Sequence, residues 1–411
     1  MQENNLKKNI VAMIIVQFSN YIAPLLVFPY LTRVLGLEGF GIVAMAMSLC
    51  AIALVFIDYG FCLSAPHWLA KNKNKKDEVA NYVGAVYLIK VCLFLIVSLV
   101  ILFYLNITNK IPHDPALQFG LIASIFFASL QPSWFFVGIE RMKHVTTFMV
   151  AAKLSYLALV FLFVKEHSQI STVFICFAIS SFFASAIGFY FIYKEKYWIA
   201  FPHHSTIYIV IKNSAIFFIS RLAVGLYTSA STFIIGTFVG FNAAALYSSA
   251  EKIYQAGQSV TSPVSQVLFP YLTRTGNKKV LYKTVLLLLV PLVIGVSGCI
   301  YYAENIMVLF FGTQFSDGAD ILRIFLVTLL FTFVSVNFGY PAFASVGRVD
   351  FANKTVIFAA TIQVVSLIIL YTTDNISTIN LCYSILFVEF VVMLTRVCLF
   401  FVQVKIQSST T

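Results

Sequence analysis

The sequence contains few charged residues. Only 10% of its 411 residues are Asp, Glu, Lys or Arg, whereas soluble globular domains average about 25%. Hydrophobic residues make up 60% of the chain, which includes 42 Phe and 21 Tyr. This composition excludes a soluble enzyme or binding domain and indicates an integral membrane protein surrounded by the lipid bilayer.

Motifs that mark common enzyme classes are also missing. No GxxxxGK[ST] phosphate-binding loop occurs, so the chain does not hydrolyse ATP by itself. The seven cysteines lie within apolar stretches without CxxC spacing, and the six histidines lie in predicted loops or at predicted helix ends. We therefore expect no metal, no cofactor and no histidine catalyst within the membrane.

Long polar loops are missing as well, because apolar stretches separated by short segments occupy the whole chain. At roughly 20 residues for each crossing, these stretches predict an all-α integral membrane protein with about 12 transmembrane helices. A membrane polymerase, ligase or acyltransferase commonly carries its catalytic groups on a long outer loop. An enzyme is therefore the disfavoured alternative, and we predict no catalytic residue.

Basic residues concentrate on one side of the predicted membrane, as in the segment with Lys71, Lys73, Lys75 and Lys76. This bias marks the cytoplasmic side, so both termini are expected there. The first apolar stretch lacks a small-residue cleavage site and is expected to be a retained helix. The net charge of +11 is explained by topology, and we predict no binding of nucleic acid.

The two halves of the sequence resemble each other weakly. An offset of 204 residues aligns Gly36 with Gly240, and an offset of 207 aligns Gly138–Met142 with Ser345–Val349. Because each half would hold an even number of helices, both halves have the same orientation, related by a pseudo-two-fold axis along the membrane normal. The predicted six-helix bundles are residues 1–204 and 205–411.

Polar residues recur at steps of three and four in the predicted helix 244–270: Glu251, Lys252, Gln255, Gln258, Ser259, Ser262 and Gln266. This spacing places them along one face of the helix. Polar groups cost several kcal/mol each when they meet hydrocarbon, so the face must contact protein or water. We interpret it as the wall of a substrate pathway. The alternative is a purely structural scaffold, which would not need such a face.

Two basic residues lie deep within neighbouring predicted helices, Arg221 in 213–239 and Lys252 in 244–270. Two cations near the middle of the membrane would attract an anionic headgroup such as a lipid-linked diphosphate. The alternative is that they form ion pairs with Asp58 and Glu251. The predicted substrate-binding residues are Arg221, Lys252, Gln255, Ser259, Ser262, Gln17 and Asn20.

Three carboxylates within predicted helices are candidates for coupling transport to protons or sodium: Asp58, Glu251 and Glu389. Asp58 has a simpler alternative role as a counter-ion near the inner surface. Three further basic residues lie close enough to predicted inner helix ends to extend toward the interface: Lys90, Lys153 and Arg396.

Several segments carry a resemblance to a known family. They are PYLTRVLGLEGFG (Pro29–Gly41), DYGFCLSA (Asp58–Ala65), VGIERMK (Val137–Lys143) and FVGFNAAALYSSAEKI (Phe238–Ile253). In order and spacing, the chain resembles the polysaccharide-transport family of O-antigen flippases (Wzx), within a superfamily of drug exporters and lipid flippases. The resemblance implies a MATE-like, V-shaped pair of six-helix bundles with a central cationic cavity.

The resemblance also implies a function and a location. Such a protein turns undecaprenyl-diphosphate-linked oligosaccharide from the inner to the outer leaflet of the bacterial inner membrane by alternating access. It would act as a monomer beside a polysaccharide polymerase and chain-length machinery. The alternative is an ion-coupled exporter of small molecules or drugs on the same fold. Because buried basic residues outnumber acidic ones, the sequence favours the anionic lipid-linked substrate.

Overall fold

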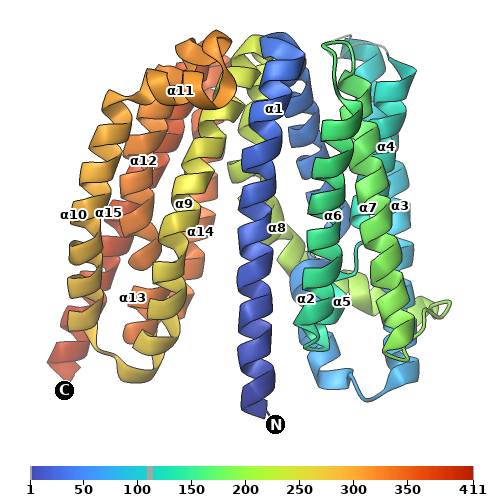
Figure 1. Cartoon of the computed structure of the whole chain (residues 1–411). Coiled ribbons are helices and arrows are strands. Elements are labelled where there is room, and N and C mark those ends of the chain that lie inside the picture. The colour runs from blue at the N-terminus through green and yellow to red at the C-terminus, as the bar shows by residue number, and fades with distance from the viewer. Residues whose placement is uncertain (1, 109–113, 411) are drawn as a thin grey trace. The chain divides into compact units, whose positions relative to one another are not determined.

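The computed structural model describes the backbone of residues 2–108 and 114–410, and the side chains of residues 26–108, 114–219, 221–222, 225 and 230–406. Every regular element in these ranges is a helix, which confirms the predicted all-α class (Figure 1). In the described residues, nine helical segments are long and apolar enough to cross a membrane. The expected spans 213–239 and 244–270 fall in helices of 35 residues each, α8 and α9.

The chain divides into two compact units, Met1–Phe233 and Ile234–Thr411. The first, unit 1, contains α1 (Gln2–Asp58), α2 (Phe61–Asn72), α3 (Lys76–Thr108), α4 (Pro115–Ser129), α5 (Ser133–Gly138), α6 (Met142–Phe163), α7 (Ile170–Lys194) and most of α8 (His204–Phe238). The division thus falls within α8. The six-helix bundles bounded at residue 204 stay a prediction.

Unit 2 begins at the end of α8 and contains the remaining elements of the chain. They are α9 (Phe241–Thr275), α10 (Lys278–Tyr301), α11 (Ala303–Phe311), the 3-10 helix η1 (Thr313–Gly318), α12 (Ala319–Asn337), α13 (Tyr340–Ser345), α14 (Val349–Thr372) and α15 (Thr378–Thr410).

Two sharp turns in unit 1 depend on glycine. Within the long α1, Gly36 has φ 70° and ψ −173°, so two helices meet there. Between α1 and α2, Gly60 has φ 79°, and an added Cβ would lie 2.6 Å from the backbone nitrogen of Phe218 in α8. Side chains rarely tolerate these conformations, and glycine adopts them readily. Gly60 thereby lets the chain turn close to α8 just after Asp58.

Proline interrupts one span in each unit. In unit 1, α4 ends at Ser129, and the short α5 begins after Pro132. In unit 2, α12 ends at Asn337, and the short α13 contains Pro341. Proline lacks a backbone N–H and its ring clashes with the preceding helical turn, so neither helix continues through it. The last carbonyl groups of α4 and α12 therefore need donors other than their own helix.

The two interruptions have the same local structure. Both α5 and α13 have six residues, and they begin 207 positions apart, which is the offset found in the sequence. After α5, the Arg141 amide donates to the Phe136 carbonyl at 2.8 Å, and after α13, the Arg348 amide donates to the Phe343 carbonyl at 2.9 Å. The short helices are also core elements, since Phe136 and Phe343 are fully buried.

Candidate functional site

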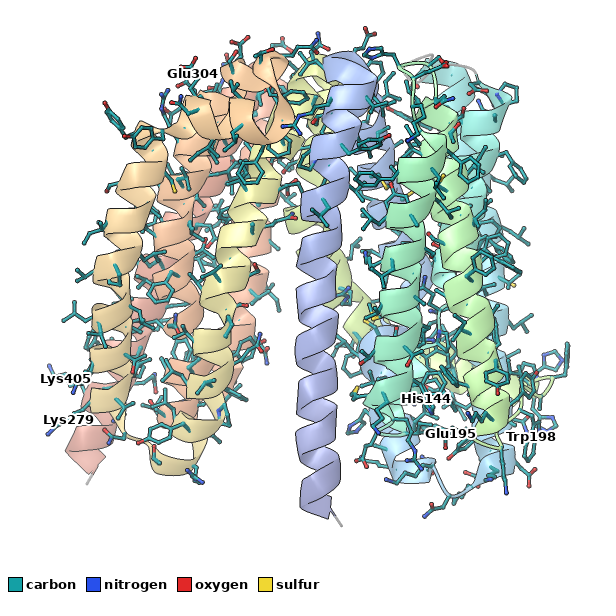
Figure 2. The ribbon with its side chains drawn as sticks, viewed as in Figure 1. His144, Glu195, Trp198, Lys279, Glu304 and Lys405 are labelled. Atoms are coloured by element: carbon teal, nitrogen blue, oxygen red, sulfur yellow. The ribbon has the colours of Figure 1, made fainter. Side chains whose placement is uncertain are left out.

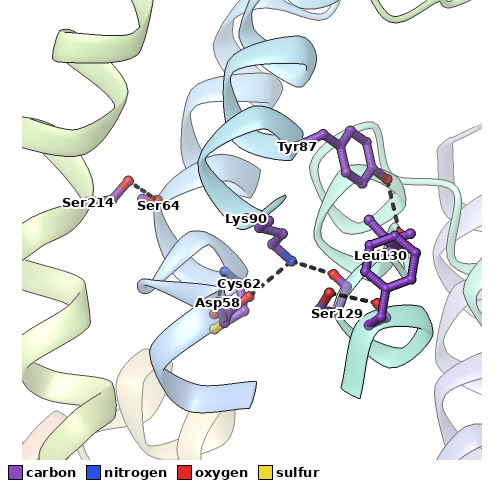
Figure 3. A network of polar contacts seen from close by, with 9 residues as sticks. Asp58, Cys62, Ser64, Tyr87, Lys90, Ser129, Leu130 and Ser214 are labelled. Atoms are coloured by element: carbon purple, nitrogen blue, oxygen red, sulfur yellow. Dashed lines mark hydrogen bonds and ion pairs between the residues drawn. The ribbon is translucent and has the colours of Figure 1, made fainter. Parts of the chain in front are cut away.

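The interruption after α4 receives a buried lysine from α3. Lys90 is 3% exposed, and its Nζ donates to the carbonyl oxygen of Ser129 at 3.1 Å (Figure 3). The same Nζ lies 3.5 Å from Asp58 Oδ1 and 5.9 Å from the centre of the Trp134 ring. The prediction that Lys90 extends toward the interface is therefore wrong. A carbonyl freed by proline and a nearby carboxylate hold its ammonium group inside unit 1.

Asp58 supplies the charge that compensates Lys90. It is the last residue of α1, and its Oδ2 accepts a hydrogen bond from the backbone N–H of Cys62 at 3.1 Å. The Gly60 turn brings that N–H back toward the carboxylate. A buried ammonium without a partner would cost several kcal/mol. This geometry fits the counter-ion role of Asp58, and its role in ion coupling stays a prediction.

Helix α8 packs closely against this region. The hydroxyl groups of Ser64 and Ser214 form a buried hydrogen bond of 2.8 Å, and the rings of Tyr59 and Phe218 stack with centres 4.8 Å apart. At Gly225, an added Cβ would lie 2.9 Å from a methyl carbon of Val55 in α1. Glycine at this position thus allows the backbone of α8 to approach α1.

The result of this packing is a cavity of about 430 Å³ within unit 1. Its polar lining includes the side chains of Asp58, Lys90, Gln131 and Arg221. Among the side chains that the structure describes, no carboxylate lies within ion-pairing distance of Arg221. Since Asp58 already balances Lys90, Arg221 gives this cavity a net positive charge that suits an anionic group.

The residues of the predicted polar face belong to α9 of unit 2, the helix labelled α9 in Figure 1. Lys252 Nζ donates to Gln255 Oε1 at 3.2 Å, so these two side chains meet on that face. The hydroxyl groups of Ser259 and Ser262 donate to carbonyl oxygens one turn back in the same helix, at 2.6 and 3.4 Å. All four side chains are half-buried, whereas Gln266 is exposed. The oxygen atoms of Gln255, Ser259 and Ser262 can therefore accept hydrogen bonds from a polar ligand, and the Lys252 ammonium can donate them.

The opposite face of α9 is apolar and exposed. Val260 and Val267 are 79% and 70% exposed, and Val264 lies nine residues, or half a turn in angle, from Gln255. Together with α10, this side forms an apolar groove of about 500 Å³. Because α9 can present this side to hydrocarbon, its polar residues need not meet lipid.

Two of the predicted coupling carboxylates lie near a buried tyrosine of α9. The Tyr254 hydroxyl is hydrogen-bonded to Thr332 Oγ1 at 2.9 Å, and its ring stacks on Phe325 with centres 5.1 Å apart. Both Glu251 and Glu389 lie within electrostatic range of this hydroxyl. Both carboxylate side chains are half-buried. The structure thus brings Glu251 and Glu389 toward the same tyrosine, and their role in coupling stays a prediction.

Arg396 of α15 is a buried cation beside the interrupted span of unit 2, as Lys90 is beside the interrupted span of unit 1. It is 9% exposed, and its Nη1 donates to both the carbonyl and the hydroxyl oxygen of Ser335 near the end of α12, at 3.0 Å each. Its Nε donates to Thr355 Oγ1 at 3.0 Å. The prediction that Arg396 extends to the interface is therefore wrong. The proline near the end of each broken helix marks carbonyl groups that need other donors, but no local pattern identifies the cation that supplies them.

Two predicted substrate residues, Gln17 and Asn20, have side chains outside the described residues. Of the others, Arg221 belongs to unit 1 and the residues of α9 to unit 2. Their joint contact with one substrate stays a prediction.

Comparison with solved structures identifies the fold. The chain resembles a multidrug resistance MATE family transporter in its inward-facing conformation, with a TM-score of 0.71 and 15% identity over 98% of this chain and 99% of that one. It also resembles a eukaryotic MATE transporter, with a TM-score of 0.63 and 17% identity over 98% and 97% of the two chains. The predicted MATE-like fold is confirmed.

Comparison with known sequences identifies the family. A protein of Escherichia coli (strain K12) named "Putative O-antigen transporter" is 28% identical over 276 residues, which are 66% of each chain. A protein of Shigella dysenteriae with the same name is 25% identical over 324 residues, which are 77% of this chain and 81% of that one. Residues 6–276 match the family described as polysaccharide biosynthesis protein. The chain therefore belongs to the polysaccharide biosynthesis protein family, on a MATE-like fold.

Proposed function

We propose that this protein is a flippase that moves undecaprenyl-diphosphate-linked O-antigen repeat units from the cytoplasmic to the periplasmic leaflet of a bacterial inner membrane. The names of the relatives in Escherichia coli and Shigella dysenteriae support this substrate class. The proposal includes alternating access, cytoplasmic termini and a monomer that works beside a polysaccharide polymerase and chain-length machinery.

The observation that carries the proposal is the charge of the unit 1 cavity. Lys90 is balanced by Asp58 at 3.5 Å, whereas Arg221 has no carboxylate within ion-pairing distance among the described side chains. A guanidinium can bind a phosphate oxygen pair through two parallel hydrogen bonds, which makes arginine well suited to a diphosphate. In this proposal Arg221 holds the diphosphate at one stage of the transport cycle.

The polar face of α9 would contact the sugars. Sugar hydroxyls both donate and accept hydrogen bonds, and the amide of Gln255 and the hydroxyls of Ser259 and Ser262 offer matching groups. Lys252 would add a second contact to the diphosphate. The isoprenoid tail would remain in hydrocarbon, so no closed apolar cavity of its length is needed.

Glu251 and Glu389 are the carboxylates that we propose for coupling to protons or sodium. Protonation of a carboxylate near Tyr254 would remove a charge from the interior of unit 2. This would change the relative stability of the two conformations that alternate during transport. Asp58 is the weaker candidate, because its charge compensates Lys90.

The test is a deletion strain complemented with variants. Without the protein, lipid-linked repeat units are expected to accumulate at the cytosolic leaflet while surface polysaccharide is lost. Arg221→Gln should restore neither export nor surface polysaccharide at equal protein level, whereas Arg221→Lys should restore part of both. Full surface polysaccharide with Arg221→Gln would contradict the proposed contact, and full polysaccharide in the deletion strain would contradict the function.

The second candidate function is a small-molecule exporter, which the MATE fold favours. Drug susceptibility of the same deletion strain distinguishes the two. If deletion makes cells sensitive to several drugs and leaves lipid-linked repeat units unchanged, the exporter is the correct assignment.

A further inference from the structure

The end of unit 1 that the charge distribution predicts to be cytoplasmic contains a second cavity, of about 660 Å³. Figure 2 shows His144, Glu195 and Trp198 at this end of unit 1. The charged and titratable lining consists of Lys73, Lys76, Glu140, Arg141, Lys143, His144, Glu195 and Tyr197. Four permanent cations thus face two carboxylates, so the cavity has excess positive charge.

Three chain segments that form the cavity are fastened to one another. Lys73, after α2, forms an ion pair of 3.2 Å with Glu140, after α5. Glu195, after α7, accepts from His144 Nε2 at 2.8 Å and lies 3.5 Å from Arg141 Nε. These links hold the walls in place without a ligand, which reduces the ordering cost of binding.

Tyr197 completes this framework. Its hydroxyl donates to the carbonyl oxygen of Lys73 at 2.8 Å. Burial, together with the nearby Glu195 carboxylate, raises the pKa of Tyr197, which is consistent with a neutral phenol that donates this hydrogen bond. Lys76 lies over the same ring, with its Nζ 5.4 Å from the ring centre.

Two ammonium groups are left over once these contacts are formed. Lys73 and Arg141 are engaged by carboxylates, whereas Lys76 and Lys143 have no carboxylate within ion-pairing distance in the part of the chain that the structure describes. A lysine ammonium binds phosphate as a compact positive charge, so two of them facing one cavity are suited to a phosphate group.

Aromatic side chains indicate the depth of the cavity in the membrane. Tyr190, Tyr193 and Trp198, which lie within five positions of Glu195 in the sequence, are 61%, 57% and 41% exposed. Such rings are favoured at the level of lipid headgroups. Negatively charged lipids also attract basic residues on the cytoplasmic surface.

We infer that this cavity binds the phosphate group of an anionic phospholipid in the cytoplasmic leaflet, with Lys76 and Lys143 as its main contacts. This site shares no lining residue with the Arg221 cavity and includes no residue of α9, and it does not depend on what the protein transports. A bound lipid would join the loops after α2, α5 and α7 and stabilise unit 1.

The test measures thermal unfolding of the purified full-length protein in detergent, titrated with dioleoylphosphatidylglycerol. The double variant Lys76→Gln/Lys143→Gln is compared with Lys71→Gln/Lys194→Gln, which removes two charges from the same end of unit 1 outside the cavity. We expect each ammonium group that contacts the lipid phosphate directly within the cavity to contribute about fivefold to affinity. The cavity variant should therefore need about 25-fold more lipid for half of the shift, and the control variant much less than that.

Three results would overturn the inference. They are an equal response of the cavity and control variants, an equal effect of dioleoylphosphatidylcholine, and stabilisation by inorganic pyrophosphate without any effect of phosphatidylglycerol. The last result would assign the cavity to a soluble phosphate. If the double variant does not fold, Lys143→Gln alone should raise the half-saturating lipid concentration about fivefold, and an unchanged value would count against the site.

Discussion

The pairing of Lys90 with Asp58 predicts a large and asymmetric effect of mutation on stability. Asp58→Asn leaves the Lys90 ammonium, 3% exposed, without its counter-charge. Breaking a buried ion pair in this way costs about 3–5 kcal/mol. Because the Asp58 side chain is 23% exposed, water can partly replace it. We therefore expect a loss near the lower limit, about 3 kcal/mol in the free energy of unfolding.

The opposite substitution should cost less. Lys90→Met removes the buried charge and leaves Asp58 with the Cys62 N–H at 3.1 Å and with access to water. The Ser129 carbonyl loses a donor, so we expect about 1–2 kcal/mol. The double variant Asp58→Asn/Lys90→Met should be more stable than Asp58→Asn alone, because no uncompensated charge remains inside unit 1.

The assay is equilibrium unfolding of the four proteins in mixed micelles, which gives the coupling free energy of the pair. The control is Glu78→Gln, which breaks the exposed Lys75–Glu78 ion pair and should change stability by less than about 1 kcal/mol. Wild-type stability of Asp58→Asn, or strictly additive effects of the two substitutions, would refute charge compensation as the reason for this geometry.

Three further outcomes follow from the described contacts. Gly60→Ala should destabilise the protein by about 1–3 kcal/mol, because Gly60 has φ 79° and a side chain there would meet the backbone of α8. The control Gly295→Ala should be neutral or stabilising, because nothing lies within 4 Å of the added Cβ. Thermal unfolding compares the two variants, and equal effects would contradict the argument. Tyr254→Phe should cost about 1 kcal/mol by removing the 2.9 Å hydrogen bond to Thr332, and unchanged unfolding would show that this bond contributes nothing. In the deletion strain, Arg221→Lys should restore more surface polysaccharide than Arg221→Gln, because it keeps the positive charge. A lysine variant as inactive as the glutamine variant would indicate that transport needs the bidentate geometry of arginine and not charge alone.

Local sequence patterns were sufficient for some parts of the candidate site. The steps of three and four that place Lys252, Gln255, Ser259 and Ser262 on one helical face depend only on helix geometry, and α9 has this face. The repeat at an offset of 207 was detected from a few residues near Gly138, and the same interruption occurs in both units.

Other parts could not be read from local patterns. Lys90 and Arg396 were expected at the interface because each lies near a predicted helix end, yet both are buried and bonded to the ends of broken helices. Their partners are distant in sequence, because Ser129 lies 39 positions from Lys90 and Ser335 lies 61 positions from Arg396. The two cations also come from helices that do not correspond in the repeat, α3 and α15.

The sequence by itself determined that this chain is a helical membrane protein, because composition and helical period reflect the solvent around each segment. The family was indicated separately, by the resemblance of segments such as Pro29–Gly41. Only the tertiary structure decided which charges are compensated and which remain for a ligand. The sequence shows that a charged residue lies within a membrane-spanning helix, where burial costs free energy. Whether that cost is offset depends on atoms that folding brings within about 4 Å of the charge. Lys90 has such a carboxylate in Asp58, and among the described side chains Arg221 does not.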